Sequence, residues 1–228
     1  MAKNIVKILS DPEVGDVLFN RSVRSRSISI RVHPSKRVTV TFPYIVPYAA
    51  ARAFYQMRRD WVLETMARQK EKYKDVHMPS PDEIEVMRKK AKAELPPRLA
   101  VLAERYGFAY NRVTIKHNAT NWGSCSARSN INLNLNIVRL PKVLQDYVLL
   151  HELCHLRHQD HGHGFHLLLE HVLTDNILKL MESGNPDVPS SVEEASYASE
   201  LARKAASSRA RYPMDYVMTR AIKTFRLV

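Results

Sequence analysis

The chain has 228 residues, of which 45% are hydrophobic and 25% are charged, as in an ordinary soluble globular protein. Its two cysteines provide no disulfide framework, no apolar run approaches the roughly 20 residues of a membrane span, and no signal peptide is recognised, so we expect a cytoplasmic protein without membrane contact. The net charge of +12 favours polyanionic partners, nucleic acid above all, but a solvated basic surface fits the same dispersed lysines and arginines.

The N-terminal region, residues 1–75, is predicted to be rich in antiparallel strands. The segments 27–32 and 37–42 both alternate apolar and polar side chains with a period of two, which is typical of strands with one buried face. A turn is expected between them at residues 34–36. Residues 16–21 are expected to supply a further strand.

A helix is predicted from about residue 48 to about residue 72. Its apolar residues recur near helical spacing and include Phe54 and Trp61. Such a stripe belongs far more often to a core than to a binding surface, so we interpret both as packing residues. A linker follows at residues 75–80.

The next predicted helix begins at a capping box. Ser80 is the expected N-cap, and Glu83 lies three residues after it. Gly107 is a typical C-terminal glycine for this helix. Pro96 and Pro97 are expected to break or kink it, because proline removes a helical hydrogen bond.

Two strands are predicted in the middle of the chain, at residues 111–117 and 131–138. In the second, four apolar residues alternate with asparagines, so one face is apolar and the other carries amides. That pattern suits a strand whose polar side faces water or a cleft. The alternating residues are Ile131, Asn132, Leu133, Asn134, Leu135, Asn136 and Ile137.

Helices are predicted for most of the remaining chain. One begins at Pro141, and another runs from about Gly164 to about Met181. The composition shifts to Ser, Ala, Glu and Arg from Pro186, which indicates a helical C-terminal extension over residues 186–228. Pro213 is expected to break the chain's helical structure after the first helix of this extension.

The most informative feature is a histidine cluster, since seven of the ten histidines lie between residues 151 and 171. The first two form an H-E-x-x-H pattern with His151, Glu152 and His155. Positions i and i+4 share one helix face, so the two imidazoles can bind one ion. A zinc ion held there polarises a water, and Glu152 can act as general base on it.

A hydrolytic zinc site needs a third protein ligand and leaves one position open. The candidates are His158, His161, His163 and His166. We favour His161, because a segment that has turned back suits a tetrahedron better than a third ligand on one straight helix. The spacing of His151, His155 and His161 equals that of the three histidines in metzincins. Metzincins have a glycine between the second and third histidines, where this chain has His158. Histidine is among the residue types tolerated in left-handed backbone, so a turn remains possible there. Cys154 lies off the ligand pair and is interpreted as a small buried thiol.

With these motifs the chain resembles the YgjP-like family of zinc metallopeptidases, which are relatives of the SprT-like proteases. The resemblance covers about residues 22–186 and is most specific in WGSCS (122–126), NINLNLNIVRLP (130–141) and DYVLLHELCHLRHQDHGHGF (146–165). It implies an α+β fold with a zincin-like metallopeptidase core at residues 80–185. It also implies His151, His155 and His161 as zinc ligands and Glu152 as catalytic base.

Two positions depart from the family pattern. Asn121 stands where the family usually has arginine, and His166 stands where tryptophan is common. The proposed ligands are unaffected, so the departures concern substrate contacts.

Several residues are candidates for substrate binding. In zincins an edge strand beside the active-site helix pairs with the substrate, and the strand with Asn132 and Asn134 is a candidate, although an ordinary core strand fits its alternation equally well. Trp122 either lines the cleft or packs in the core. His163 and His166 are candidates for stabilising the oxyanion.

The sequence thus favours a zinc-dependent metallopeptidase that acts on a protein or peptide. The alternatives are a basic nucleic-acid-associated protein with a structural zinc site, or a protease that acts on DNA-bound proteins, by analogy with the SprT-like relatives. A structural site would have a fourth protein ligand, such as His163 or Cys154. A loose metal-binding histidine patch is the remaining alternative.

Overall fold

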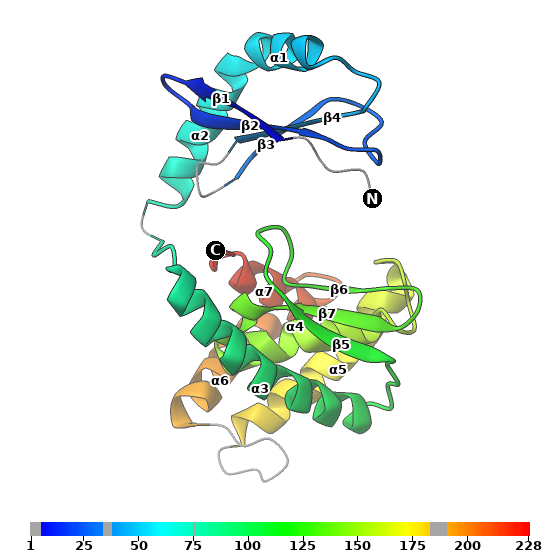
Figure 1. The fold of residues 1–228 in the computed structure, drawn as a ribbon. Helices are drawn as coiled ribbons and strands as arrows, with labels where there is room; N and C mark the ends of the chain where they lie inside the picture. The colour runs from blue at the N-terminus through cyan, green and yellow to red at the C-terminus, as the bar shows by residue number, and fades with distance from the viewer. Residues whose placement is uncertain (1–5, 34–37, 75, 183–190) are drawn as a thin grey trace. The chain divides into compact units, whose positions relative to one another are not determined.

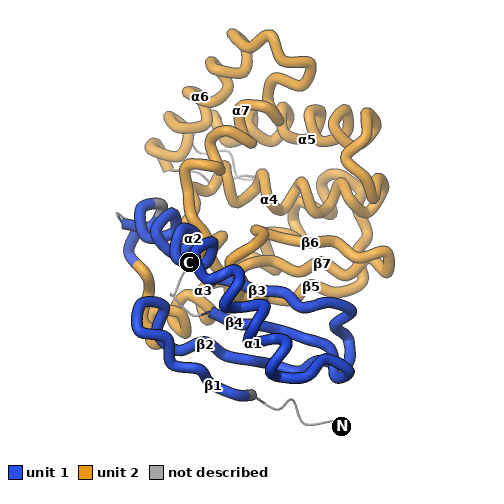
Figure 2. The backbone as a smooth tube through the Cα atoms, turned by 90° about the horizontal axis from the view of Figure 1, so that it is seen from above, with its two compact units in different colours: residues 1–77 blue, residues 78–228 orange. Residues whose placement is uncertain are grey.

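The chain divides into two compact units, residues 1–77 and residues 78–228 (Figure 2). The turn expected at residues 34–36 and the domain boundary expected at residue 186 lie outside the part of the chain that can be described. Within that part, no helix is both long and apolar enough to cross a bilayer. The computed structural model describes residues 6–33, 38–74, 76–182 and 191–228.

The first unit contains a four-stranded sheet in the order β1-β2-β4-β3 (Figure 1). The pairs β1–β2 and β3–β4 are antiparallel, but the central pair β2–β4 is parallel. The expectation of an antiparallel region is therefore wrong at the centre of the sheet, and strand β1 was not expected. Alternation predicts which face of a strand is buried but not its neighbour or direction. The strands are β1 (Val6–Asp11), β2 (Gly15–Arg21), β3 (Ser29–Val32) and β4 (Val38–Phe42).

Two helices, α1 (Tyr48–Met57) and α2 (Arg59–Lys72), replace the single helix expected here. Their buried stripe runs through Ala51, Tyr55 and Val62, not through the residues expected to pack. Phe54 and Trp61 each lie one residue before this stripe, about 100° round the helix. Phe54 is half-buried and Trp61 is 42% exposed, so the packing role expected for Trp61 is wrong.

A buried carboxylate ties the first hairpin to both helices. Asp11 accepts hydrogen bonds from the backbone N–H groups of Glu13 and Val14, each at 3.1 Å. The Tyr55 hydroxyl donates to it at 2.9 Å, and the Arg59 guanidinium at 2.8 and 3.0 Å. The Arg59 guanidinium holds the pKa of Asp11 well below its ordinary value. The ionised carboxylate therefore stabilises this unit.

Asp11→Asn is expected to lower the free energy of unfolding by about 2–3 kcal/mol at neutral pH, because hydrogen bonds to a charged group are lost. The unfolded chain binds a proton at Asp11 near its ordinary pKa of 3.8, whereas the folded chain binds it only at lower pH. The stabilisation is thus complete above about pH 5 and is lost as the pH falls toward the folded pKa. Urea unfolding between pH 3 and pH 7, followed by circular dichroism, measures it.

The control for this prediction is Asp16→Asn, which removes an exposed carboxylate on strand β2. We expect it to change the free energy of unfolding by less than about 0.5 kcal/mol. A similar loss in both variants, or no loss in Asp11→Asn, would contradict the role given to Asp11.

The second unit places helix α4 at the centre of a mixed α and β arrangement (Figure 1). Its sheet has the order β5-β7-β6, with β5 parallel and β6 antiparallel to β7. Helix α4 contacts the sheet and also helices α3, α5, α6 and α7. The elements are α3 (Pro81–Arg105), β5 (Arg112–Lys116), β6 (Gly123–Cys125), β7 (Asn130–Asn134), the 3-10 helix η1 (Leu135–Arg139), α4 (Lys142–Cys154), α5 (His163–Met181), α6 (Val192–Ala206) and α7 (Pro213–Ile222).

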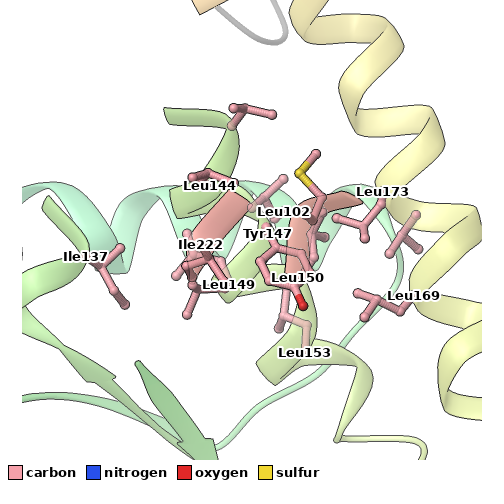
Figure 3. Packing of buried hydrophobic residues seen from close by; sticks show 14 of the residues in the cluster. Leu102, Ile137, Leu144, Tyr147, Leu149, Leu150, Leu153, Leu169, Leu173 and Ile222 are labelled. Carbon is pink, nitrogen blue, oxygen red and sulfur yellow. The ribbon is translucent and has the colours of Figure 1, made fainter. Parts of the chain in front are cut away.

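The core of this unit forms around α4 (Figure 3). Leu149, Leu150 and Leu153 of α4 are fully buried, and Leu173 of α5 and Ile222 of α7 belong to the same cluster. The described part of the C-terminal extension, residues 191–228, therefore packs on this core. Pro213 does not break a helix but is the first residue of α7, where its missing N–H leaves no hydrogen bond unmade.

Helix α3 agrees with its predicted beginning but not with its predicted break. Ser80 and Glu83 form the expected capping box, with reciprocal hydrogen bonds of 2.7 and 3.3 Å. The helix nevertheless continues through Pro96 and Pro97. The carbonyl groups four residues earlier belong to exposed residues, so water can satisfy them.

The strand predicted at residues 131–138 begins one residue earlier and ends sooner than expected. Strand β7 ends at Asn134, whose side chain accepts a hydrogen bond from the backbone N–H of Asn136 at 3.0 Å. This local bond begins the 3-10 helix η1, because asparagine side chains compete with the strand hydrogen bonds. Residues 135–137 are buried despite leaving the strand.

Candidate metal centre

Three histidines of the cluster converge at the end of α4. His151 lies in the last turn of the helix and His155 is its C-cap, with 4.9 Å between their ring centroids. His161 follows a turn and returns to the helix, where its Nε2 lies 3.2 Å from Nε2 of His151. One nitrogen from each of the three rings lies within 4.8 Å of the others.

This arrangement fits a zinc ion. Two nitrogens that each lie 2.0–2.1 Å from a tetrahedral zinc are separated by about 3.3 Å, close to the distance between His151 and His161. Burial, with a smaller contribution from neighbouring histidines, lowers the pKa of His151 to about 3, and burial also lowers the pKa of His155. These two imidazoles are therefore uncharged at neutral pH, as a metal ligand requires.

The turn after α4 orients the second ligand. The Nδ1 atom of His155 lies 3.0 Å from the carbonyl oxygen of His158. A carbonyl only accepts, so Nδ1 carries the hydrogen and Nε2 is left for the ion. The left-handed backbone considered for His158 is not found, since Ser129 is the only non-glycine residue with positive φ in the described ranges. His158 contributes its carbonyl group and not a ligand.

Phe165 forms an apolar wall against the three histidines. This side chain is 1% exposed, and its ring centroid lies 4.6 Å from that of His155, 4.7 Å from that of His161 and 4.9 Å from that of His151. It is the residue of helix α5 that fixes all three imidazole planes. Packing on this scale limits how far each ring can rotate.

Phe165→Leu is expected to weaken zinc binding by about tenfold, because residues that orient metal ligands typically contribute 10–100-fold to affinity. Competition with a chelating dye measures the dissociation constant. The control is Phe225→Leu, since Phe225 is partly buried against the same core. An affinity within twofold of wild type in Phe165→Leu would show that Phe165 does not hold the ligands.

Glu152 lies beside this group in an enclosed position. It is 5% exposed, and its Oε2 atom is buried without a hydrogen-bond partner among the described residues. Burial raises the pKa of Glu152 to about 8 in the metal-free chain. An unpaired buried carboxyl group is costly unless a ligand completes it. A cation bound at the neighbouring imidazoles would favour its ionised form.

The space for Glu152 is provided by Gly123 of strand β6. A Cβ atom at this position would lie 2.5 Å from Oε1 of Glu152 and 2.7 Å from its Cδ and Cγ atoms. Only glycine therefore leaves room for the Glu152 side chain against this strand. Gly123 was not among the site residues predicted from the sequence, although a glycine within a strand is a known indication of close approach.

The comparison with known families agrees with this geometry, since residues 82–177 match the model of the YgjP-like metallopeptidase domain. Residues 82–177 are thus similar to a YgjP-like metallopeptidase domain. The family resemblance inferred from the sequence is thereby confirmed. No curated protein and no solved structure matches the chain. The matched residues extend from α3 into α5 and do not include α6 or α7.

Two further histidines of the matched residues contact the C-terminal helix or its N-cap. His166 Nδ1 lies 2.7 Å from Oδ2 of Asp215, and His163 Nδ1 contacts the hydroxyl group of Tyr212. The sequence indicated both histidines but neither of their partners. No periodicity or motif connects residues about 50 positions apart, so only the packing of α7 against α5 reveals these pairs.

The other residues expected at the substrate differ in their surroundings. Asn134 is fully buried and donates to the carbonyl groups of Asn118 and Asn121 at 2.7 and 2.9 Å, so its amide holds a loop. Asn132 is half-buried and donates to Ser124 at 3.1 Å. Trp122 is half-buried and packs against the core.

Proposed function

We propose that the YgjP-like domain is a zinc-dependent peptidase with a zincin-like core. The observation that carries the proposal is the enclosed Glu152 carboxyl group with its unpaired oxygen, on the residue that directly follows His151, one of three converging imidazoles. This is the arrangement in which a general base serves a metal-assisted hydrolysis. The metallopeptidase family match supports the same reaction class.

In this proposal His151, His155 and His161 hold the ion, and Glu152 transfers the proton. Zinc, when bound, supplies Lewis acidity that polarises a carbonyl group and lowers the pKa of water. Glu152 takes the proton of the attacking water on a carboxylate oxygen and delivers it to the nitrogen of the leaving amine. The enclosure by Gly123 keeps the carboxyl group oriented through both proton transfers.

The edge strand beside the site is β6 and not the strand expected from the sequence. Strand β7 lies between β5 and β6, so both its edges are occupied and an edge role for it is wrong. The N–H of Asn134 donates to the Trp122 carbonyl at 2.8 Å. Alternation in an antiparallel pair then turns the backbone groups of Gly123 and Cys125 away from β7. We propose that an extended substrate pairs with this short outer edge and displaces the Asn121 amide, which donates to the Gly123 carbonyl at 2.6 Å.

The nucleic-acid alternative with a structural zinc has less support. A structural site usually has four protein ligands, but the candidate group within the described residues has three members. Cys154 is buried outside this group, and His163 contacts Tyr212. A three-ligand group with an open position favours the hydrolytic proposal over this alternative.

The test combines metal analysis with a broad peptide-cleavage screen. Protein purified without added zinc is expected to contain about one equivalent of metal. His161→Ala is expected to lose the metal and the cleavage activity together, and its thermal unfolding controls for misfolding. If zinc-loaded wild-type protein cleaves none of a diverse peptide library, the proposed function is wrong.

A further inference from the structure

His166 is held by a buried carboxylate of the C-terminal helix. Its Nδ1 atom lies 2.7 Å from Oδ2 of Asp215, which is 7% exposed. An ionised carboxylate only accepts hydrogen bonds, so Nδ1 of His166 is the donor. This bond lies in the ring plane and fixes the direction of the other ring nitrogen, Nε2.

Asp215 is itself fixed by neighbouring elements. Its Oδ1 atom accepts a hydrogen bond from the hydroxyl group of Tyr147 at 3.3 Å, and Tyr147 lies one helical turn before His151 in α4. The backbone N–H of Asp215 donates to Oε2 of Glu170 at 3.0 Å, which attaches the beginning of α7 to α5. The carboxylate therefore has a defined position relative to the candidate metal centre.

The face of the His166 ring is covered by Tyr212. The two rings are stacked, with 5.2 Å between their centroids and an interplanar angle of 21°. The bond to Asp215 and this stacking together restrict rotation of the imidazole. His163 is exposed, and its contacts among the described residues are with the hydroxyl group and the ring of the same tyrosine. Of the two histidines considered for the oxyanion, His166 is the better fixed.

The remaining nitrogen of His166 is available to a substrate. The described residues provide no hydrogen-bond partner for Nε2, and 32% of the side chain is exposed. The ring centroid lies 6.3 Å from that of His161. A fixed imidazole with one free nitrogen thus lies beside the three ligands.

We propose that Nε2 of His166 donates a hydrogen bond to the substrate carbonyl oxygen as negative charge develops on it, and that Asp215 is the positioning residue for this imidazole. The inference rests on the proposed peptidase function. This donation requires a hydrogen on Nε2 in addition to the one on Nδ1, and the hydrogen stays on Nε2 throughout. Asp215 and Tyr212 lie outside the matched residues 82–177.

The kinetic test compares His166→Ala and Asp215→Ala with wild type after zinc loading. Both variants are expected to lower kcat by about 10–100-fold, to change KM by less than about threefold and to keep the metal, because the contact strengthens in the transition state. Asp215→Glu is expected to restore part of kcat. The control is Asp175→Ala, which removes a carboxylate that accepts from the Tyr106 hydroxyl at 2.8 Å. Asp175 lies about 13 Å from His166 along α5.

A second measurement uses the metal-free protein and needs no activity. Nitrogen-15 NMR of the histidine rings is expected to find a hydrogen on Nδ1 of His166 in wild type and Asp175→Ala, and a loss of this preference in Asp215→Ala. A neutral ring with its only hydrogen on Nε2 in wild type would overturn the positioning role. Unchanged kcat in folded, zinc-loaded His166→Ala would overturn the substrate contact while the peptidase proposal stands. If wild type cleaves no peptide, both proposals fail.

Discussion

Glu152→Gln is expected to lower kcat for peptide cleavage by about 10²–10⁴-fold while the protein keeps its metal, because general acid–base catalysis contributes a factor of this size. Glutamine fills the same enclosed space but cannot accept the proton of water. The KM should change little, since the carboxyl group is 5% exposed and contributes little surface to substrate binding. Steady-state kinetics with metal analysis of the same samples measures both effects.

The control for Glu152 is Glu104→Gln, which changes an exposed glutamate near the end of α3. It should leave kcat and metal content unchanged. Cleavage that survives in Glu152→Gln would refute the role of Glu152 as base. Loss of the metal together with activity would instead identify Glu152 as a ligand.

Gly123→Ala is expected to reduce kcat by about 10²-fold or more, because its new methyl group would lie 2.5 Å from Oε1 of Glu152. The carboxyl group must move, and a misplacement of about 1 Å can cost a factor of 10² in rate. Overpacking should also lower the free energy of unfolding by about 1–3 kcal/mol. Kinetics, metal content and urea unfolding of the zinc-loaded protein measure these changes.

A double variant distinguishes a specific effect of Gly123 from general damage. If Gly123→Ala acts through the carboxyl group, adding it to Glu152→Gln should lower kcat by less than about threefold further. Full additivity of the two losses would mean that Gly123 acts elsewhere in the site. Ser124→Ala, on the same short strand, is the control for disturbance of β6.

The candidate ligands could be predicted from the sequence because their spacing is a local property. His151 and His155 lie one helical turn apart, and this geometry follows from the backbone alone. The choice of His161 needed the additional expectation that the chain turns back after the helix. The structure brings these three nitrogens within 4.8 Å of one another, as that expectation requires.

The fold could likewise be predicted only where short-range patterns in the sequence determine it. The strands at 16–21, 27–32 and 37–42 and the capping box at Ser80 follow from short-range patterns, and the structure contains them. The parallel pairing of β2 with β4 does not follow from such patterns, since alternation is identical for either direction. The exposure of Trp61 depends on which of two adjacent helix faces meets the sheet, and periodicity alone does not distinguish them.

By itself, the sequence determined that an H-E-x-x-H helix, a returning third histidine and an acidic side chain could form a hydrolytic metal site. Only the tertiary structure decided which groups surround that site. Gly123 makes room for Glu152, β6 and not β7 is the outer strand of the sheet, and Asp215 of α7 holds His166. Each of these contacts joins segments far apart in the chain. They depend on which elements pack together, and the local spacing of residues does not predict that packing.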